Sequence, residues 1–236
     1  MKSHLVKRTS FIAVVVVALT GLSGCATTTD HPKDPFEGFN RAMFAVNEGI
    51  DTVVKPVAQG YDKITPMPVR AGIGNFFGNI GDVWIAFNNL LQGKPIDCLS
   101  DIGRVLVNTT VGMAGLFDVA SEIGLEKHSE DFGQTLGKWG FYDGPYFVWP
   151  IIGPRNTRDT FGFAVDATAD PVRHINHVPT RNTLVGVRFI DLRASLLPAD
   201  KIMEEAAFDK YSYVRSAYMQ NRRSAIHDGN PPPLEE

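Results

Sequence analysis

The chain has 236 residues, of which 44% are hydrophobic and 21% are charged. This composition is typical of a globular protein with a sizeable core, so it excludes disordered and fibrous classes. The 23 basic and 26 acidic residues give a net charge of -3. Because that balance offers no basic surface for a phosphate backbone, we expect no nucleic acid partner.

The N-terminus has the layout of a secretory signal. Lys2, Lys7 and Arg8 precede an apolar run from Phe11 to Leu19, which is shorter than the roughly 20 residues of a comfortable membrane span. The run is followed by Leu22-Ser23-Gly24-Cys25, which resembles the bacterial lipobox, where a peptidase cuts before a cysteine that carries a diacylglyceryl group. The alternatives are ordinary secretion and a retained signal anchor.

The lipobox predicts a lipid-anchored protein. Residues 1–24 are then a lipoprotein signal peptide, and Cys25 is the acylated first residue of the mature chain. Several acyl chains hold a protein on a bilayer essentially permanently. Ala26 stands where an aspartate usually retains lipoproteins in the inner membrane, which favours the outer membrane. Cys98 is left without a disulfide partner, so we expect it to be a small buried residue.

The mature chain divides into a tether, one domain and a tail. We expect a lipidated tether at 25–33, a helical domain at 34–223 and a mobile tail at 224–236, which contains three consecutive prolines. Apolar residues recur at spacings of three and four through most of the domain, so we predict an all-α class with one short extended piece at 146–152. Predicted helices cover 36–55, 73–91, 97–106, 116–123, 158–169, 183–197, 199–207 and 209–225.

The wide apolar helix faces allow two interpretations. In the first, they meet one another in a water-soluble bundle that hangs from the anchor. In the second, several helices lie in the membrane interface with one face among acyl chains. Periodicity does not decide between them.

Motifs for chemistry are scarce. The mature chain has no G-x-S-x-G elbow, so a serine hydrolase of that type lacks a nucleophile. His174 and His177 have metal-ligand spacing but no nearby Cys or Glu. Asp159, Asp166 and Asp170 form a carboxylate set that solvated helix faces and caps explain equally well. We therefore expect no catalytic residue, no metal and no cofactor.

Five local phrases resemble one protein family. They are Asp34–Arg41, Gly133–Gly140, Gly144–Arg155, Arg158-Asp159 and Tyr213–Tyr218, and they follow the lipobox in this order. Together they resemble the MlaA family, also called VacJ-like lipoproteins, from the lipobox to about residue 223. Each phrase alone is weak, but five in order are specific.

The resemblance implies a non-enzymatic function in lipid transport. Family members are outer-membrane lipoproteins that remove misplaced phospholipid from the outer leaflet and pass it to a periplasmic carrier, MlaC. Their fold is a ring of helices lying in the membrane with a central amphipathic channel, and they associate with trimeric porins. This favours the second interpretation of the helix faces. A lipid-anchored scaffold of a porin or envelope complex is the alternative function, and a periplasmic hydrolase is a distant third.

Two groups of residues are candidates for the site. By position, the first matches the family's apolar hairpin beside the channel, and we hypothesise that it gates lipid entry: Val111, Gly112, Met113, Ala114, Gly115, Leu116 and Phe117. The second, Phe36, Phe39 and Asn40, either seats the ring at the membrane or serves capping and packing, with Asp34 as N-cap.

The aromatic residues of two predicted loops and the arginines of the last predicted helix each allow two interpretations. We expect loops at 134–140 and 142–155, whose Trp139, Tyr142, Tyr146 and Trp149 are suited to a bilayer interface or to burial. In the last helix, Arg215, Arg222 and Arg223 either contact the carrier or a headgroup, or are solvated charges.

Overall fold

The computed structural model describes residues 31–206 and 208–233. The predicted signal peptide and Cys25 lie outside these residues. The described chain is a mostly helical single domain, which confirms the all-α class, and its one addition is a two-stranded hairpin. The elements are α2 Glu37–Ile64, α3 Met67–Leu91, α4 Pro95–Thr110, α5 Val119–Glu122, α6 Phe132–Lys138, β1 Tyr146–Trp149, β2 Gly153–Asn156, α7 Thr157–Ala169, the 3-10 turn η2 Pro171–His174, α8 Val178–Ser195, α9 Leu197–Ala206 and α10 Lys210–Ile226.

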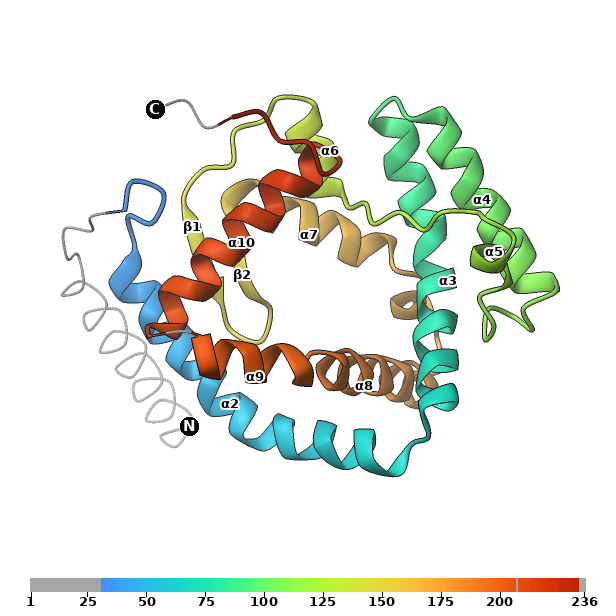
Figure 1. The fold of residues 1–236 in the computed structure, drawn as a ribbon, viewed down its shortest axis with the longest axis horizontal. Helices are drawn as coiled ribbons and strands as arrows, with labels where there is room; N and C mark the ends of the chain where they lie inside the picture. Colours follow the sequence, from blue (N-terminus) through green and yellow to red (C-terminus); the bar gives the residue numbers. More distant parts are fainter. Residues whose placement is uncertain (1–30, 207, 234–236) are drawn as a thin grey trace, which may run out of the picture.

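The helices are arranged as a closed ring (Figure 1). Helix α3 contacts α8, α8 contacts α9, α9 contacts α10, α10 contacts α6, and α6 returns to α3. Helix α2 packs along α8, while α4 and α5 lie outside α3. Helix α7 packs on α6 and on β2. Elements that are far apart in sequence therefore meet around one centre.

The hairpin has one face that packs against α10 and an opposite face with different residues. Strands β1 and β2 are antiparallel, with Tyr146 opposite Asn156 and Phe147 opposite Arg155. Tyr146 and Val148 share one face and form a small core with Tyr211 of α10. Because side chains alternate along a strand, Phe147 and Arg155 occupy the opposite face.

The first helix differs from its prediction at both ends. It continues through Pro56 to Ile64, rather than ending near residue 55. Proline removes one backbone donor, and packing offsets that loss, since Ala58 is fully buried and the Tyr61 hydroxyl donates to Asp191 of α8. The helix begins at Glu37 with no side-chain cap, so the prediction of Asp34 as N-cap is wrong.

Helix α6 occupies residues that were predicted as a loop. Glycines at 133 and 137 made the segment read as irregular, but Asp131 caps the helix by accepting from the backbone nitrogen of Gln134 at 2.8 Å. A Cβ at Gly162 of α7 would overlap the backbone of Gly133. The glycines therefore allow α6 and α7 to approach closely, and tertiary packing overrides their low helix propensity.

The last helix, α10, lies within one residue of its predicted range of 209–225. Residues 224–226, which the predicted tail also included, are its final turn. The described tail residue Asp228 pairs with Lys94 and with Lys138, which connects the tail to the turn between α3 and α4 and to α6.

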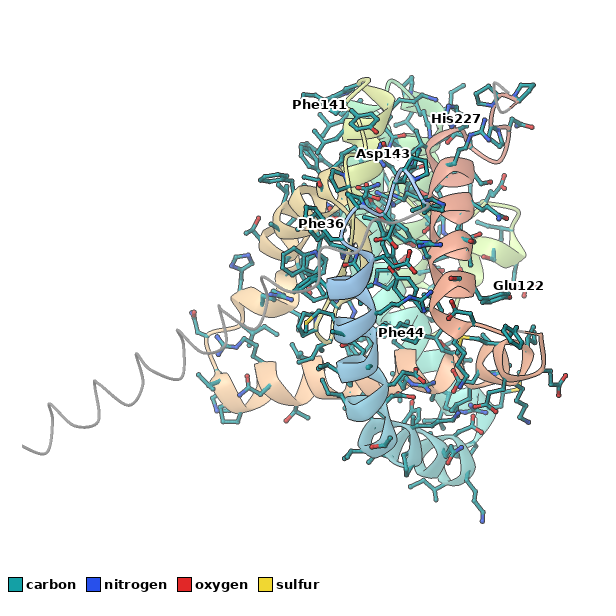
Figure 2. The ribbon with its side chains drawn as sticks, turned by 90° about the vertical axis from the view of Figure 1, so that its left-hand side faces the viewer. Phe36, Phe44, Glu122, Phe141, Asp143 and His227 are labelled. Carbon is teal, nitrogen blue, oxygen red and sulfur yellow. The ribbon has the colours of Figure 1, made fainter. Side chains whose placement is uncertain are left out.

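Large apolar side chains remain exposed over much of the surface. Within the described residues, no helix is long and apolar enough to cross a bilayer. Nevertheless, Val53 is 70% exposed, Ile96 80% and Leu99 68%. Figure 2 shows Phe36 and Phe141 on the α7 side of the ring, with His227 on the α10 side. Exposure on this scale marks an interaction surface rather than an ordinary aqueous one.

Candidate functional site

Two cavities share a wall inside the ring. The inner cavity, about 480 Å³, is lined by α3, α7, η2 and α8. The α10 cavity, about 810 Å³, is lined mainly by α10, with contributions from α6, β2 and the segment before α6. Glu130 and Asp131 belong to both linings. This pair of residues, which we call the shared wall, therefore lies between the two cavities.

The inner cavity is amphipathic. Its apolar residues include Ile80, Val185 and Phe189, which come from α3 and α8. Its charged residues include Asp170, which accepts from Arg188 at 3.0 Å. A molecule with one polar end and one apolar end can therefore find both kinds of surface within one cavity.

Trp84 forms the boundary between the inner cavity and the outer surface. Its Nε1 donates to Asp166 Oδ1 at 2.7 Å inside the ring, and its indole stacks on Phe87 at 5.1 Å. The outer side is an apolar groove of about 550 Å³ between α3 and α4. The groove is lined by Val83, Trp84, Ala86, Phe87, Leu90, Cys98, Ile102, Val105 and Leu106. Cys98 is buried as expected.

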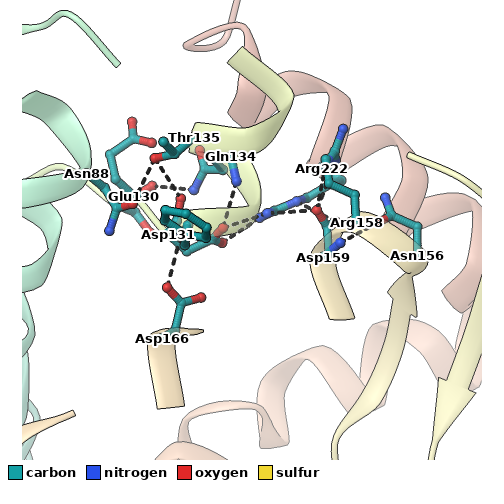
Figure 3. Close-up of polar contacts among 12 residues, drawn as sticks. Asn88, Glu130, Asp131, Gln134, Thr135, Asn156, Arg158, Asp159, Asp166 and Arg222 are labelled. Carbon is teal, nitrogen blue, oxygen red and sulfur yellow. Dashed lines mark hydrogen bonds and ion pairs between the residues drawn. The ribbon is translucent and has the colours of Figure 1, made fainter. Parts of the chain in front are cut away.

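The shared wall is held against α3 by polar contacts. Glu130 accepts from Gln92 at 2.7 Å and from Lys94 at 3.0 Å. The Thr135 hydroxyl donates to Asn88 at 2.8 Å. Figure 3 shows Glu130 and Thr135 on the α3 side of this cluster. The segment 130–135 is therefore fixed to one wall of the ring.

On its other side, the wall is joined to α7 and α10 by an ion network (Figure 3). Arg222 donates to both carboxylate oxygens of Asp131, at 2.5 and 2.6 Å, and its Nε lies 2.6 Å from Asp159 Oδ2. Asp159 also accepts from the Tyr218 hydroxyl at 2.5 Å and from Arg158 Nε at 3.0 Å. A bidentate arginine between two carboxylates fixes geometry strongly. We call this set, Asp131, Arg158, Asp159, Tyr218 and Arg222, the closure network.

The closure network corrects several expectations. Asp159 is 1% exposed, so it does not lie on a solvated helix face. Arg222 is mostly buried in the network, and Arg215 is buried against Asp34 at 2.6 Å, so neither is a solvated charge. Arg223 contacts the carbonyl oxygen of Pro232.

The pKa values of two carboxyl groups at the shared wall, those of Asp131 and Asp166, are shifted in opposite directions. Burial raises the pKa of Asp166, and the hydrogen bonds from Trp84 and Phe132 offset this only in part. Burial also opposes ionisation of Asp131, but the hydrogen bonds from Arg222 prevail and lower its pKa. Ionised Asp166 is therefore the electrostatically costly group of the inner cavity.

The predicted gate segment lies outside α3. Its residues form a tight turn in which Met113, Ala114 and Gly115 all have positive φ, and a Cβ at Gly112 would overlap the carbonyl oxygen of Phe117. Asn75 of α3 donates to the carbonyl oxygen of Leu116 at 3.2 Å. Val111 and Met113 are 66% and 64% exposed. None of the seven residues lines the inner cavity, the α10 cavity or the apolar groove.

The predicted seating residues have different environments. Phe36 is 46% exposed and stacks on Phe147, with ring centroids 5.2 Å apart, and Phe39 is half-buried. Asn40 is fully buried and donates to Asp34 at 2.8 Å and to the Tyr146 carbonyl oxygen at 2.9 Å. Asn40 therefore joins α2 to the hairpin, while the exposed part of the Phe36 ring is free to contact a membrane or another protein.

The four aromatic residues of the predicted loops fall into an exposed pair and a packed pair. Tyr142 is 78% exposed and Trp139 is 50% exposed. Tyr146 is buried in the hairpin core, and Trp149 donates through Nε1 to Thr160 of α7 at 3.0 Å. Only the first pair is therefore free to contact a membrane interface.

The histidine pair has local roles. His174 Nε2 lies 2.6 Å from the Thr168 carbonyl oxygen, and His177 caps α8. Over the described residues, no group of three potential ligands could hold a metal ion.

Sequence reasoning missed the shared wall at Glu130 and Asp131 and the boundary role of Trp84. The contacts that give them these roles, from Glu130 to Gln92, from Asp131 to Arg222 and from Trp84 to Asp166, join residues more than thirty positions apart, and no local pattern encodes them.

Comparisons with known proteins agree with one another. The family model described as MlaA lipoprotein matches residues 32–225. The intermembrane phospholipid transport system lipoprotein MlaA of Escherichia coli K12 is 32% identical, with 97% of this chain and 92% of that protein covered. The Haemophilus influenzae protein of the same description is 30% identical, with 94% and 92% covered.

A solved structure has the same fold. Its description reads "Structural basis for maintenance of bacterial outer membrane lipid asymmetry". It is 33% identical to this chain with a TM-score of 0.71, covering 84% of this chain and 99% of the solved one.

Proposed function

Because this chain belongs to the MlaA lipoprotein family, we propose that it extracts misplaced phospholipid from the outer leaflet of the outer membrane and passes it towards the periplasm. Relatives described as lipoproteins of an intermembrane phospholipid transport system support this assignment. The protein performs no covalent reaction in this proposal.

The observation that carries the proposal is the contrast between the outside and the inside of the ring. The outer groove between α3 and α4 is apolar, whereas the inner cavity behind Trp84 contains Asp166 and Arg188. A phospholipid that moves between leaflets needs polar partners for its headgroup and apolar surroundings for its tails. The ring offers both on opposite sides of α3, and Trp84 lines both spaces.

This contrast supports a ring embedded in the membrane, and the lipobox sequence supports its anchoring through an acylated Cys25. Apolar side chains exposed on α2, α3 and α4 then contact acyl chains, which offsets the cost of leaving them in water. The shared wall and closure network join α3 to α7 and α10 around the polar interior of the ring.

We propose a gating role for the turn at residues 111–117. Its exposed Val111 and Met113 place apolar surface beside the lipid-facing groove, and its packing on Asn75 connects it to a helix of the inner cavity. Met113→Glu tests this role, with Met113→Leu as the matched apolar control. The gate is wrong if Met113→Glu clears outer-leaflet phospholipid as fast as Met113→Leu.

Two partners complete the proposal. A periplasmic carrier of the MlaC type takes up the lipid, and a trimeric porin holds the ring in the membrane. The family resemblance supports both partners, and the description of relatives as lipoproteins of an intermembrane phospholipid transport system adds support for a carrier.

The main experiment compares a deletion strain with strains that express the wild type or Cys25→Ala. Outer-leaflet phospholipid is labelled with a membrane-impermeant amine reagent. We expect phospholipid to accumulate in the deletion strain and to return to normal only with the anchored protein. Unchanged labelling in a strain with a weakened envelope favours the scaffold function, and turnover of ester substrates by pure protein favours a hydrolase.

A further inference from the structure

Arg155 has unusual surroundings for a partly buried arginine. Its Nε is buried without a hydrogen-bond partner. The other arginines with such an atom, which are Arg70, Arg104, Arg193, Arg215 and Arg222, each use another nitrogen to bind a carboxylate. Among the described residues, the side chain of Arg155 makes no hydrogen bond or ion pair, and burial lowers its pKa. A partly buried guanidinium whose Nε has no partner is costly, so its retention calls for a physical reason.

The position of Arg155 relates it to both cavities. Its guanidinium carbon lies 4.2 Å from the ring centroid of Phe163, which lines the inner cavity. The preceding residue, Pro154, lines the α10 cavity. Arg155 also faces away from the hairpin core, on the strand face opposite Tyr146. Arg155 itself is not among the lining residues of either cavity, but it lies directly next to one lining residue of each.

The neighbouring carboxylates are already engaged. Asp131 and Asp159 contribute to the electrostatic surroundings of Arg155, but Arg222 binds both of them in the closure network. Asp166 accepts from Trp84 and from the backbone of Phe132. The stacking on Phe163 orients the guanidinium plane while leaving its edge unpaired.

From these observations we propose that Arg155 binds the phosphate group of phospholipid as the headgroup crosses from one cavity to the other. This inference rests on the proposed function and names a contact residue within its passage. A guanidinium binds phosphate through two parallel hydrogen bonds, which a single ammonium does not reproduce. The phosphate also supplies the counter-charge that Arg155 lacks, so binding relieves an existing cost.

The test measures lipid affinity with and without the phosphate group. The full lipoprotein in detergent is titrated with brominated phosphatidylethanolamine, which quenches tryptophan fluorescence, and separately with brominated diacylglycerol, which has the same tails without phosphate. The variants are Arg155→Gln and Arg155→Lys. The control is Arg181→Gln, because Arg181 on α8 also lacks an ion pair within the described chain but, unlike Arg155, does not stack on a residue that lines the inner cavity.

We expect Arg155→Gln to weaken phosphatidylethanolamine binding about tenfold, which corresponds to about 1.4 kcal/mol. Binding of diacylglycerol stays unchanged, Arg155→Lys retains an intermediate affinity, and Arg181→Gln matches the wild type. Because the substitution removes a buried unpaired charge, the Tm of Arg155→Gln does not fall. An equal loss for both ligands, or a lower Tm with unchanged affinity, would show that Arg155 only supports the structure, and the inference fails.

Inorganic phosphate separates the two sources of the anion. If phosphate alone binds in an Arg155-dependent way while phospholipid affinity is unaffected by Arg155→Gln, the site is one for free phosphate and the lipid assignment is wrong. Failure of this inference is distinct from failure of the proposed function. In the first case wild type and Arg155→Gln both clear outer-leaflet phospholipid normally, whereas in the second case the wild type itself has no effect.

Discussion

Replacing Arg222 by methionine tests whether the closure network holds the ring together. The side chain is 15% exposed and neutralises both Asp131 and Asp159, which lie on different elements. Removing one partner of a buried ion pair costs about 3–5 kcal/mol because the other charge remains without compensation. Asp159 keeps Arg158 and the Tyr218 hydroxyl, and Asp131 is one-third exposed, so we expect the lower end, about 3 kcal/mol.

Arg223→Met is the matched control. Arg223 is the next residue on the same helix, and its side chain contacts only a carbonyl oxygen of the described tail, so its loss changes the free energy of unfolding by less than about 0.5 kcal/mol. Urea unfolding in detergent, followed by circular dichroism, gives both free energies. Adding Asp131→Asn to Arg222→Met restores part of the loss because it removes the uncompensated charge. Equal stability of Arg222→Met and Arg223→Met would refute the reasoning.

Three further predictions concern packing, ionisation and hydrogen bonding. Gly162→Ala destabilises by about 1–3 kcal/mol through overlap with Gly133, whereas Gly186→Ala, which meets open space within α8, stabilises by up to about 1 kcal/mol, and thermal unfolding compares them. Because the pKa of Asp166 is raised on folding, its ionisation opposes folding above that pKa; Asp166→Asn therefore raises the Tm at pH 7.5, and the gain disappears towards pH 4. A gain that is independent of pH would contradict this. Asn40→Ala loses three buried hydrogen bonds and destabilises by about 2 kcal/mol, and a urea midpoint equal to that of the wild type would contradict its joining role.

Amphipathic periodicity predicted the helices but not how they close. The end of α3 before Gly93 and the break after α4 are local signals, and the structure has both. Pro56 was read as a helix end because proline usually is one, and only the burial of Ala58 explains the continuation. Helix α6 was missed since its glycines are required by α7, an element that is distant in the sequence.

The candidate site was less predictable than the fold. The family resemblance located the turn at 111–117 by position, yet the residues that line the inner space are distributed over four separate elements. Neither alternative for Arg222 included a buried ion pair, because its partners, Asp131 and Asp159, stand 91 and 63 positions earlier in the sequence. Arg155 shows the limit of sequence reasoning most clearly. Nothing in the sequence distinguishes it from other arginines, and only the structure shows that its side chain has no partner.

Filling the inner cavity is the most direct test of the claim that phospholipid passes through the ring. Ala167→Trp places an indole in that cavity, while Ala164→Trp places the same side chain on the exposed face of the same helix. Both variants are expressed in the deletion strain at matched levels, and outer-leaflet phospholipid is measured with the impermeant label. The account predicts that Ala164→Trp restores normal labelling and Ala167→Trp does not. Equal restoration by both variants, with both folded, would contradict a passage through the ring.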